Sequence, residues 1–599
     1  MKLRYLLIAS IALLGLSSCS DFLDKATDTR VTLQNEEQLR MLMISAYPSY
    51  NYALPCEMST DNVVDNNAPS MTGVRYNLDS YSRNDDEAFA WEDIRSESGS
   101  DTPSGIWEGY YNSIATCNAA LQKIQEFEDA GEVTAKLNAV KGEALVTRAY
   151  CHFMLANIFC MPWRGEQLSS NPEETPGIPY ATEPETTVKP HYERGTLAET
   201  YSKIRKDLED GLQLINDVYY EVPKYHFNKQ AAYAFATRFY LFTREYEKVI
   251  ECATQVFGGA DVDVSPYLTD IWTQTSLNYA DEYGRYYADT SHQRNFLVIP
   301  TYSIMDRHIS GRHRYAVNRE AARATLRGPG PTWESCRYIN NTTKETFAML
   351  PCFQALWVNG GQEYGVWWAA SIGEQFEYTD KIASIGYAHT MRCEFTGDEV
   401  LLNRAEAKLF LGDIDGCVSD LGIWENAHRN SPSVTADGRM ADWSKERVVD
   451  FYTRAAEGYV NYVDSTHLGK DYNEKIYFGI ARPINIDKVC PSSHPLTAEM
   501  MPFMQCIQHF RRIEFIHNGM RWFDIKRLGL SVKHVIGKDA NVVILNANIG
   551  EGRLDRRLAF QIPNEIIAAG ITPSDRTGEL TTPQQAPKRQ INDVPYYPN

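Results

Sequence analysis

The sequence lacks most of the short motifs that assign a chemistry to a protein. It contains no HExxH zinc motif, no GxSxG nucleophile motif and no glycine-rich phosphate loop of the P-loop or Rossmann type. Its twelve cysteines form no CxxC pair and show no regular spacing, so we expect mostly buried free cysteines and no disulfide framework. These absences favour a binding protein over an enzyme and give no sign of a metal or a cofactor.

The chain also has little positive charge and only one long apolar run. Its 59 Lys and Arg residues against 78 Asp and Glu residues give a formal net charge of −19. Such a chain is a poor match for nucleic acid or for an anionic lipid surface. After the first twenty residues, no stretch has the roughly 18 uninterrupted apolar residues of a transmembrane helix. With 43% hydrophobic and 12% aromatic residues, the chain nevertheless has ample material for a core.

The N-terminus carries the clearest positive signal. Lys2 and Arg4 precede an apolar run over residues 5–16, which is long enough for the core of a signal peptide and too short to span a bilayer. The run ends in Leu-Ser-Ser-Cys19, which resembles the processing site of bacterial lipoproteins. We therefore expect residues 1–18 to be a lipoprotein signal peptide, and a lipid on Cys19 to anchor the mature protein to a membrane. The alternative is an ordinary secretory signal that happens to end near a cysteine.

Three pairs of segments have the apolar period of helices and are joined by short turns. In the first pair, Leu145, Ala149 and Phe153 fall on one continuous helical face. In the second pair, small residues alternate with phenylalanines, as they do where tetratricopeptide-like helical hairpins stack. The pairs are predicted over residues 104–127 with 135–160, 196–217 with 228–242 (extended by 246–257), and 398–411 with 414–428.

Two long segments between these helices have a different character. Residues 160–195 are rich in Pro, Glu and Thr, and residues 258–397 are rich in Gly, Tyr, Trp and Asn with little sustained period. The aromatic content of the second segment argues against disorder. We therefore predict a mainly α fold, in which tetratricopeptide-like helical hairpins carry long loop-rich insertions and a few short strands.

Motifs along the whole chain resemble those of the SusD/RagB family. Cys19 followed by Phe-Leu-Asp over 22–24 is similar to the lipidated start of that family, and Arg148-Ala149 is similar to a pair in its first long helix. The most specific match is Arg-Arg-Ile-Glu-Phe over 511–515 followed by Gly-Met-Arg-Trp-Phe-Asp-Ile-Lys-Arg over 519–527. It resembles the Arg-rich helix and the Gly-x-Arg-Trp-Phe-Asp-Leu-x-Arg signature of the family.

The resemblance implies an organisation, a location and a partner. It implies one SusD-like unit over residues 19–599, with an N-terminal part over about 20–230 and a C-terminal part over about 231–599. It implies a lipid-anchored protein of the outer membrane in Bacteroidota, facing the cell exterior and partnered by a SusC-like TonB-dependent transporter. The charged residues of the signature have a structural interpretation, since paired Arg and carboxylate groups fix contacts between helices.

The residues predicted to bind a ligand are aromatic. Sugar rings stack on flat side chains and need amide or carboxyl groups at their edges. The segment around residues 357–368 combines such groups with permissive glycines, and one further tryptophan precedes it. The predicted set is Trp333, Trp357, Asn359, Tyr364, Trp367 and Trp368. The alternative is that Trp367 and Trp368 face opposite sides of a strand, with one or both in the core.

Two polar segments have both a functional and a structural interpretation. Between residues 306 and 337, seven arginines stand against three acidic residues, which would suit an acidic glycan. The alternative is internal salt bridging to acidic residues elsewhere. The polar loop over 61–67 resembles a loop found early in many family members.

The function implied by the resemblance is binding without turnover. We expect the protein to capture an oligosaccharide at the cell surface and to deliver it to the transporter for uptake. A RagB-like peptide-binding protein is the main alternative. A surface glycoside hydrolase, which needs a pair of carboxylates, and a scaffold that docks proteins on its helical hairpins are less favoured alternatives.

Overall fold

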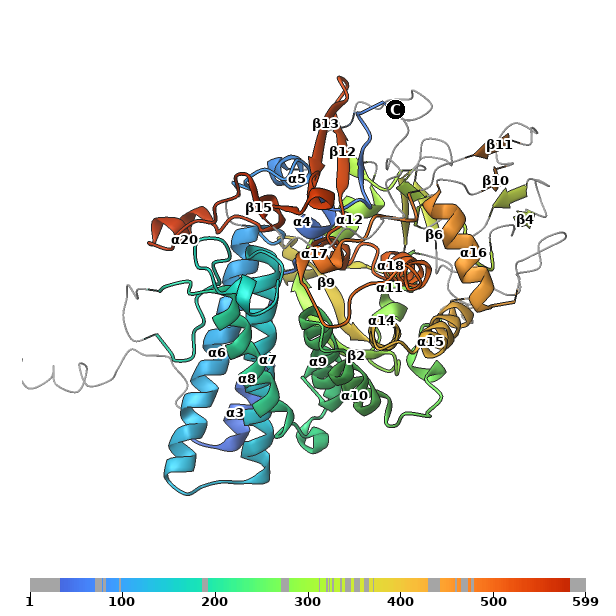
Figure 1. Ribbon diagram of the computed structural model, residues 1–599. Coiled ribbons are helices and arrows are strands. Elements are labelled where there is room, and N and C mark those ends of the chain that lie inside the picture. Colours follow the sequence, from blue (N-terminus) through green and yellow to red (C-terminus); the bar gives the residue numbers. More distant parts are fainter. Residues whose placement is uncertain are drawn as a thin grey trace, which may run out of the picture.

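The computed structural model of the chain (Figure 1) describes most residues between 33 and 581. The described residues are 33–69, 78, 82–95, 99–185, 192–270, 280–311, 313–318, 321–322, 324–325, 328–333, 337–339, 346–348, 356–359, 366–369, 371–428, 442–457, 461–464, 472–475 and 479–581. Within these ranges, no helix combines the length and the hydropathy that a membrane span requires.

Three long helices stand side by side at one end of the molecule (Figure 1). They are α6 (Pro103–Asp129), α7 (Ala135–Phe159) and α8 (Leu197–Leu212), and α3 (Glu36–Ile44) packs against the first two. Thr102, Thr134 and Thr196 cap the three helices by accepting hydrogen bonds from backbone N–H groups of the first turn. α7 lies between its neighbours, and its side chains are almost all buried.

Further helical hairpins form the other half of the scaffold. α9 (Lys229–Thr243) packs on α10 (Tyr246–Phe257), and α14 (Gly397–Phe410) packs on α15 (Ile414–Ala427). The first hairpin turns at Arg244 in the left-handed conformation (φ 63°), and the second turns at Gly412 (φ 86°). These hairpins confirm the helical pairs that the apolar period predicted.

Several shorter helices complete the helical part. α8 ends before the predicted boundary at residue 217, because Asn216 caps a separate 3-10 turn, η2 (Asp217–Tyr219). The remaining α-helices of the described residues are α4 (Ala53–Met58), α5 (Arg83–Phe89), α11 (Ala280–Tyr287), α12 (Met305–Ser310), α16 (Lys445–Ala456), α17 (Ile486–Val489), α18 (Met501–Glu514), α19 (Met520–Leu528) and α20 (Asn564–Ala568).

The strands are short and antiparallel, and they lie over the helical scaffold. The largest sheet has the order β2 (Asn295–Tyr302), β9 (Ile385–Thr396), β8 (Glu374–Asp380). The other sheets have two strands each: β1 (Val64–Asp65) with β3 (Tyr315–Ala316), β4 (Arg337–Ile339) with β5 (Thr346–Ala348), β6 (Leu356–Asn359) with β7 (Val366–Ala369), β10 (Asn461–Asp464) with β11 (Tyr472–Lys475), β12 (Val532–Ile536) with β13 (Asn541–Leu545), and β14 (Arg553–Asp555) with β15 (Glu579–Thr581). The predicted mainly α fold with a few short strands is confirmed.

The core joins distant parts of the chain. The largest cluster of buried hydrophobic side chains includes residues from Tyr52 to Leu580, and so draws on both predicted parts of the unit. The boundary near residue 230 stays a prediction. All nine cysteines of the described residues are free and buried, which confirms the prediction for them: Cys56, Cys117, Cys151, Cys160, Cys252, Cys393, Cys417, Cys490 and Cys506.

The arginines of the signature are buried and paired. Arg511 Nε lies 3.0 Å from Asp524 Oδ2, and Arg527 Nη2 lies 2.8 Å from Glu406 Oε2 on α14. Each pair links two helices, and all four side chains are buried. The structural interpretation of these residues is therefore confirmed.

The carboxylate of Asp61 in the polar loop is a second hub of ion pairs, and the side chain is 6% exposed. This carboxylate accepts hydrogen bonds from Arg521 Nε (2.9 Å) and Nη2 (3.0 Å). It also forms ion pairs with Arg482 Nη2 (2.7 Å) and Arg512 Nη1 (3.7 Å). The loop near the N-terminus is thereby fixed to the C-terminal signature. This contact shows that the polar loop serves as an attachment point within the fold.

The arginine-rich segment makes similar internal contacts. Arg314 Nη2 lies 2.9 Å from Asp65 Oδ2, and its Nη1 lies 3.1 Å from Asp86 Oδ1. Arg307 pairs with Glu374 of β8. Internal salt bridging, the structural alternative for this segment, holds for both of these arginines. Arg312, Arg319, Arg323 and Arg327 lie outside the described residues, as does the side chain of Arg337.

Candidate ligand-binding groove

An open groove with a cavity volume of about 720 Å³ runs along one face of α6. Its walls are α6, the segment around residues 179–185 with Tyr192, and α20 with the turn that follows it, and these lie together on the left of Figure 1. The volume falls in the range of pockets that hold small ligands, roughly 300–1,000 Å³. The lining combines aromatic rings, carboxylates, amides and small apolar groups. It includes Trp107, Glu108, Tyr111, Asn112, Asn118, Glu183, Glu185, Tyr192, Glu565, Ile566 and Ile571.

The spacing of residues along α6 gathers its aromatic groups on one face. Trp107, Tyr111 and Asn118 are separated by four and by seven residues, which are close to whole helical turns. The ring centroids of Trp107 and Tyr111 lie 4.8 Å apart with a tilt of 38°. Trp107 is only 6% exposed, whereas Tyr111 is half-buried. Trp107 therefore packs against the ring of Tyr111 on the protein side, and the more exposed Tyr111 ring faces the groove.

Hydrogen bonds hold the second wall against the helices. The Tyr111 hydroxyl donates to the Pro179 carbonyl (2.7 Å), and the Ala181 N–H donates to His152 Nε2 (3.2 Å). His152 Nδ1 lies 2.9 Å from the Arg148 carbonyl and must donate to it, which leaves Nε2 as an acceptor. Burial lowers the pKa of His152 to about 3, so the imidazole stays neutral and keeps this arrangement at physiological pH.

Arg194 connects the second wall to the third. Its Nε donates to the Gly177 carbonyl (2.7 Å), while Nη1 donates to the Thr572 carbonyl (3.1 Å) and to Ser574 Oγ (3.0 Å). The guanidinium is buried, so the contacts form in a water-poor environment where hydrogen bonds to a charged group are strong. Both walls of the groove are thereby held in place before any ligand binds.

The groove is acidic. Of the described residues that line it, four are glutamates, Glu108, Glu183, Glu185 and Glu565, and none is Lys, Arg or His; residues 186–191 of the second wall lie outside the described part of the chain. The Tyr192 hydroxyl donates to Glu185 Oε1 (2.7 Å), which orients this half-buried ring at the rim. The rim therefore offers hydrogen-bond acceptors and a negative potential, both of which favour neutral or cationic ligands over anionic ones.

The tryptophans predicted from the sequence lie elsewhere and are buried. Trp333, Trp367 and Trp368 are 2%, 6% and 9% exposed, and none of them lines the groove. Trp333 donates its Nε1–H to the Gly328 carbonyl (3.0 Å) and stacks near Phe510. This burial fits the alternative of core packing, because a sugar ring needs an accessible aromatic face. Their role in binding stays a prediction.

The other predicted residues can be placed only in part. Trp357 pairs with Trp368 in the ladder between β6 and β7, and Asn359 pairs with Val366, while the side chains of Trp357 and Asn359 lie outside the described residues. Tyr364 and Cys19 also lie outside the described residues.

The groove residues were missed by the sequence analysis, although one signal was present. The predicted helix over 104–127 carries two aromatic residues and an amide at helical spacing. This pattern is consistent with a binding face, but the same spacing is typical of a helix face that packs in the core. The other two walls carry no motif, because they come from residues 179–192 and 565–571 and meet α6 only in the folded chain.

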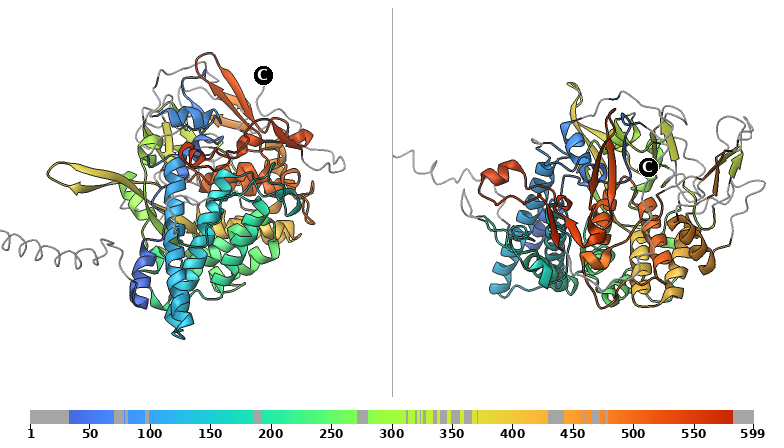
Figure 2. Two further views of the ribbon diagram at one scale, coloured as in Figure 1. Left: turned by 90° about the vertical axis from the view of Figure 1, so that its left-hand side faces the viewer. Right: turned by 45° about the horizontal axis from the view of Figure 1, so that its top comes forward.

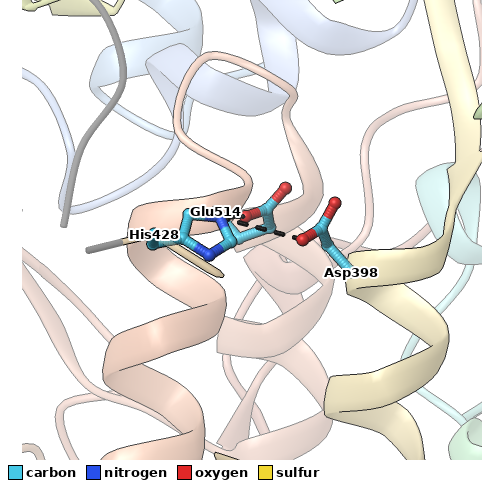
Figure 3. Close-up of side chains that lie close together, drawn as sticks. All are labelled: Asp398, His428 and Glu514. Atoms are coloured by element: carbon cyan, nitrogen blue, oxygen red, sulfur yellow. Dashed lines mark hydrogen bonds and ion pairs between the residues drawn. The ribbon is translucent and has the colours of Figure 1, made fainter. Parts of the chain in front are cut away.

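A buried cluster of Asp398, His428 and Glu514 could in principle hold a metal ion (Figure 3). His428 Nε2 lies 2.8 Å from Glu514 Oε2 and 3.8 Å from Asp398 Oδ1. Arg294 Nη2 lies 3.1 Å from Asp398 Oδ2 and 3.4 Å from Glu514 Oε1. The His428 Nδ1 atom is 2.8 Å from the Trp424 carbonyl.

These contacts describe an ion network better than a metal site. Both nitrogens of His428 face oxygen acceptors, so the ring carries two protons and donates from both. An imidazolium has no lone pair for a metal. With Arg294 the cluster contains two cations and two carboxylates and is balanced in charge. Burial lowers the pKa of His428, but the hydrogen bond to Glu514 and the charges of Glu514 and Asp398 outweigh burial and raise it.

Comparison with known proteins supports the resemblance seen in the sequence. Residues 21–241 match a family model named SusD-like_3 and described as "Starch-binding associating with outer membrane". No curated protein matches the chain.

Many solved structures share the fold. A SusD superfamily protein from Bacteroides vulgatus is 17% identical with a TM-score of 0.53, over 90% of this chain and 97% of that one. A second protein from B. vulgatus, whose name proposes sugar binding, is 18% identical with a TM-score of 0.53, over 91% and 99%. A SusD superfamily protein from Bacteroides thetaiotaomicron is 16% identical with a TM-score of 0.51, over 91% and 100%. Residues 21–241 therefore match a SusD-like family model, and the chain as a whole shares the fold of these solved structures.

Proposed function

We propose that this protein captures a neutral oligosaccharide at the cell surface, in the groove beside α6. The observation that carries the proposal is a groove of about 720 Å³ with fixed walls, accessible tyrosine rings and acceptor groups at its rim. The description of the matching family as starch-binding gives independent support for a carbohydrate ligand.

The geometry suits a sugar in three respects. The rings of Tyr111 and Tyr192 offer flat surfaces that sugar C–H faces can stack on. Carboxylates such as Glu108 and Glu565 accept hydrogen bonds from hydroxyl groups, and Asn112 can both donate and accept. The walls are held by Arg194 and His152, so little freedom is lost on binding and a larger share of the contact energy appears as affinity.

The charge of the groove narrows the class of glycan. Among the described lining residues four are glutamates and none is cationic, so these residues repel sulfated or uronic acid sugars at the rim. The seven arginines between residues 306 and 337 would suit an acidic glycan. In the described residues, Arg307 and Arg314 of that segment are occupied by carboxylates of the protein itself.

Calorimetric titration of the mature protein, starting at Ser20, with neutral glycans, acidic glycans and peptides tests the proposal. We expect saturable heat with a neutral oligosaccharide and an affinity about 10-fold weaker for Tyr192→Ala, since a stacked ring contributes on the order of 1–2 kcal/mol. Tyr225→Ala is the matched control, because Tyr225 is an exposed tyrosine in the 3-10 turn Pro223–Tyr225 and does not line the groove.

Other results would give other conclusions. Equal loss of affinity in Tyr192→Ala and Tyr225→Ala would refute the groove as the site. Loss in Trp367→Ala or Trp368→Ala, with normal folding and an unaffected Tyr192→Ala, would favour the site predicted from the sequence. Heat with peptides alone would favour the RagB-like alternative, for which Ile566 and Ile571 would supply apolar contacts.

The remaining parts of the proposal concern location and partner. We propose that a lipid on Cys19 anchors the protein in the outer membrane with the groove exposed to the exterior. The captured oligosaccharide then passes to a SusC-like TonB-dependent transporter. The protein binds and does not cleave its ligand, so incubation with a bound glycan should release no new reducing ends.

A further inference from the structure

The hairpin formed by β8 and β9 projects from the body of the molecule as a two-stranded ribbon (yellow, Figure 2, left). β9 pairs with β2 over 389–396 and with β8 over 385–390. The strands therefore continue past the end of β2, and only β8 and the first residues of β9 form the outer part. A two-stranded ribbon that leaves its sheet is seldom stable in water by itself.

The outer part of the hairpin carries large hydrophobic side chains that the chain leaves exposed. Ile382 at the turn is 98% exposed, Ile385 60%, Tyr378 50% and Phe376 46%. The rings of Phe376 and Tyr378 meet edge to face with centroids 4.9 Å apart. Exposed apolar side chains that gather on one projecting element are typical of an interaction surface.

Side-chain contacts fix the base of the hairpin to the body of the molecule, whereas the side chains at its tip are exposed. Arg307 Nε donates to Glu374 Oε2 (2.8 Å), and the Glu374 N–H donates to Asp306 Oδ2 (3.0 Å). Tyr387 packs edge to face on Tyr302 of β2 with centroids 4.7 Å apart. Because the arm is held in one direction, docking onto it costs less conformational entropy than ordering a free loop would.

The charges on β8 indicate which kind of partner can bind the hairpin. Within the described residues, no other strand pairs with the outer edge of β8. Antiparallel pairing of this edge with a second copy would place Glu377 opposite Glu377 and Glu374 opposite Asp380, and like charges in facing positions destabilise a sheet. Glu374 is paired with Arg307, and Glu377 and Asp380 stand against the single Lys381, so the hairpin carries no cationic surface that would favour an anionic lipid. A protein that presents apolar and basic groups fits best.

We propose that the β8–β9 hairpin is the arm by which this protein docks onto its transporter, which receives the tip in an apolar pocket bordered by basic side chains. That the partner is the transporter rests on the proposed function. The chemistry of the pocket follows from the hairpin itself: exposed Phe, Tyr and Ile side chains with an acidic strand beside them.

Photo-crosslinking in cells that produce the full-length lipoprotein tests the contact directly. A photoreactive residue replaces Ile382 in one strain and Val218 in another, because Val218 is also an exposed hydrophobic residue (78%) and belongs to η2. We expect position 382 to crosslink to a TonB-dependent transporter identified by mass spectrometry, and position 218 to give no such product. Products at position 382 that contain a second copy of the chain or only lipid would overturn the proposal, as would equal yields at both positions.

A substitution separates the arm from the ligand site. With Ile382→Asp, we expect at least about 10-fold less transporter to co-purify, since a buried isoleucine contributes roughly that factor or more, and Val218→Asp should leave the yield unchanged. Equal yields for the two variants would refute the docking role. Glycan binding by the isolated protein should be the same in both variants, and its absence in the unsubstituted protein would refute the proposed function without bearing on the arm.

Discussion

Replacing Asp61 with asparagine should destabilise the protein far more than an ordinary loss of charge. The side chain of Asp61 is only 6% exposed, and three guanidinium groups converge on its carboxylate at 2.7 to 3.7 Å. Asp61→Asn keeps the size and one acceptor oxygen, but it removes the carboxylate with which Arg482, Arg512 and Arg521 are paired in the described residues. Removing one partner of a buried ion pair costs about 3–5 kcal/mol, because the remaining charge stays buried and uncompensated.

The pH of the assay follows from the pKa of Asp61. Burial would raise this pKa, but the charges of Arg512, Arg521 and Arg482 outweigh burial and hold it well below its usual range. A carboxyl group whose pKa is depressed in the folded state stabilises the fold above its unfolded pKa of about 3.9 and loses this contribution as the pH falls through the folded value. At pH 7 the full contribution is therefore present.

Urea denaturation at pH 7, followed by circular dichroism, measures the effect. Asp415→Asn is the matched control: Asp415 pairs with Lys445 at 2.9 Å, but both side chains are exposed, and such pairs contribute about 0–1 kcal/mol. We expect Asp61→Asn to lower the free energy of unfolding by about 3 kcal/mol and the control by less than about 1 kcal/mol. If the two variants lost equal stability, the buried arginine hub would not be what fixes the polar loop to the C-terminal signature.

Two further predictions concern the ion network and the anchor. The pKa of His428 is raised in the folded protein, so its contribution to stability is fully present below its unfolded pKa of about 6.5 and is lost as the pH rises through the folded value. We therefore expect His428→Gln to cost more stability at pH 6 than at pH 9, measured by chemical denaturation. A cost that is the same at both pH values would contradict a protonated imidazole between Glu514 and Asp398. Metabolic labelling with a fatty acid analogue should mark the wild-type protein in membranes and leave Cys19→Ala unlabelled in the soluble fraction. A labelled Cys19→Ala variant would place the lipid elsewhere.

Much of the scaffold was predictable because its helices carry local signals. Thr196 with Glu199 forms a capping box at the start of α8, and Thr243-Arg244-Glu245 marks the turn between α9 and α10. Apolar residues at helical spacing then fix which face is buried. The end of α8 was wrong by several residues, since Asn216 begins a new turn that the apolar pattern alone does not reveal.

The groove could not be predicted from local sequence patterns, and the reason is physical. Tyr111, Ala181 and Ile566 become neighbours only through tertiary packing, and no local period relates residues so far apart. The tryptophan cluster shows the opposite case. Its composition suggested accessible rings, yet Trp367 and Trp368 are both buried in β7, because that strand is covered on both of its faces. Composition alone does not say which faces of a strand are covered.

The placement of the family motifs explains why they identify a fold and say little about a ligand. Arg511, Arg527 and Asp61 are buried in ion pairs that join helices to loops, and changing one of them leaves an uncompensated charge in the core. Tyr192 and Ile382 lie at the surface, where substitution costs the fold little. A chain can therefore keep the scaffold while its groove and its projecting arm change, so the proposed choice of ligand and of partner has to be tested at those surface residues.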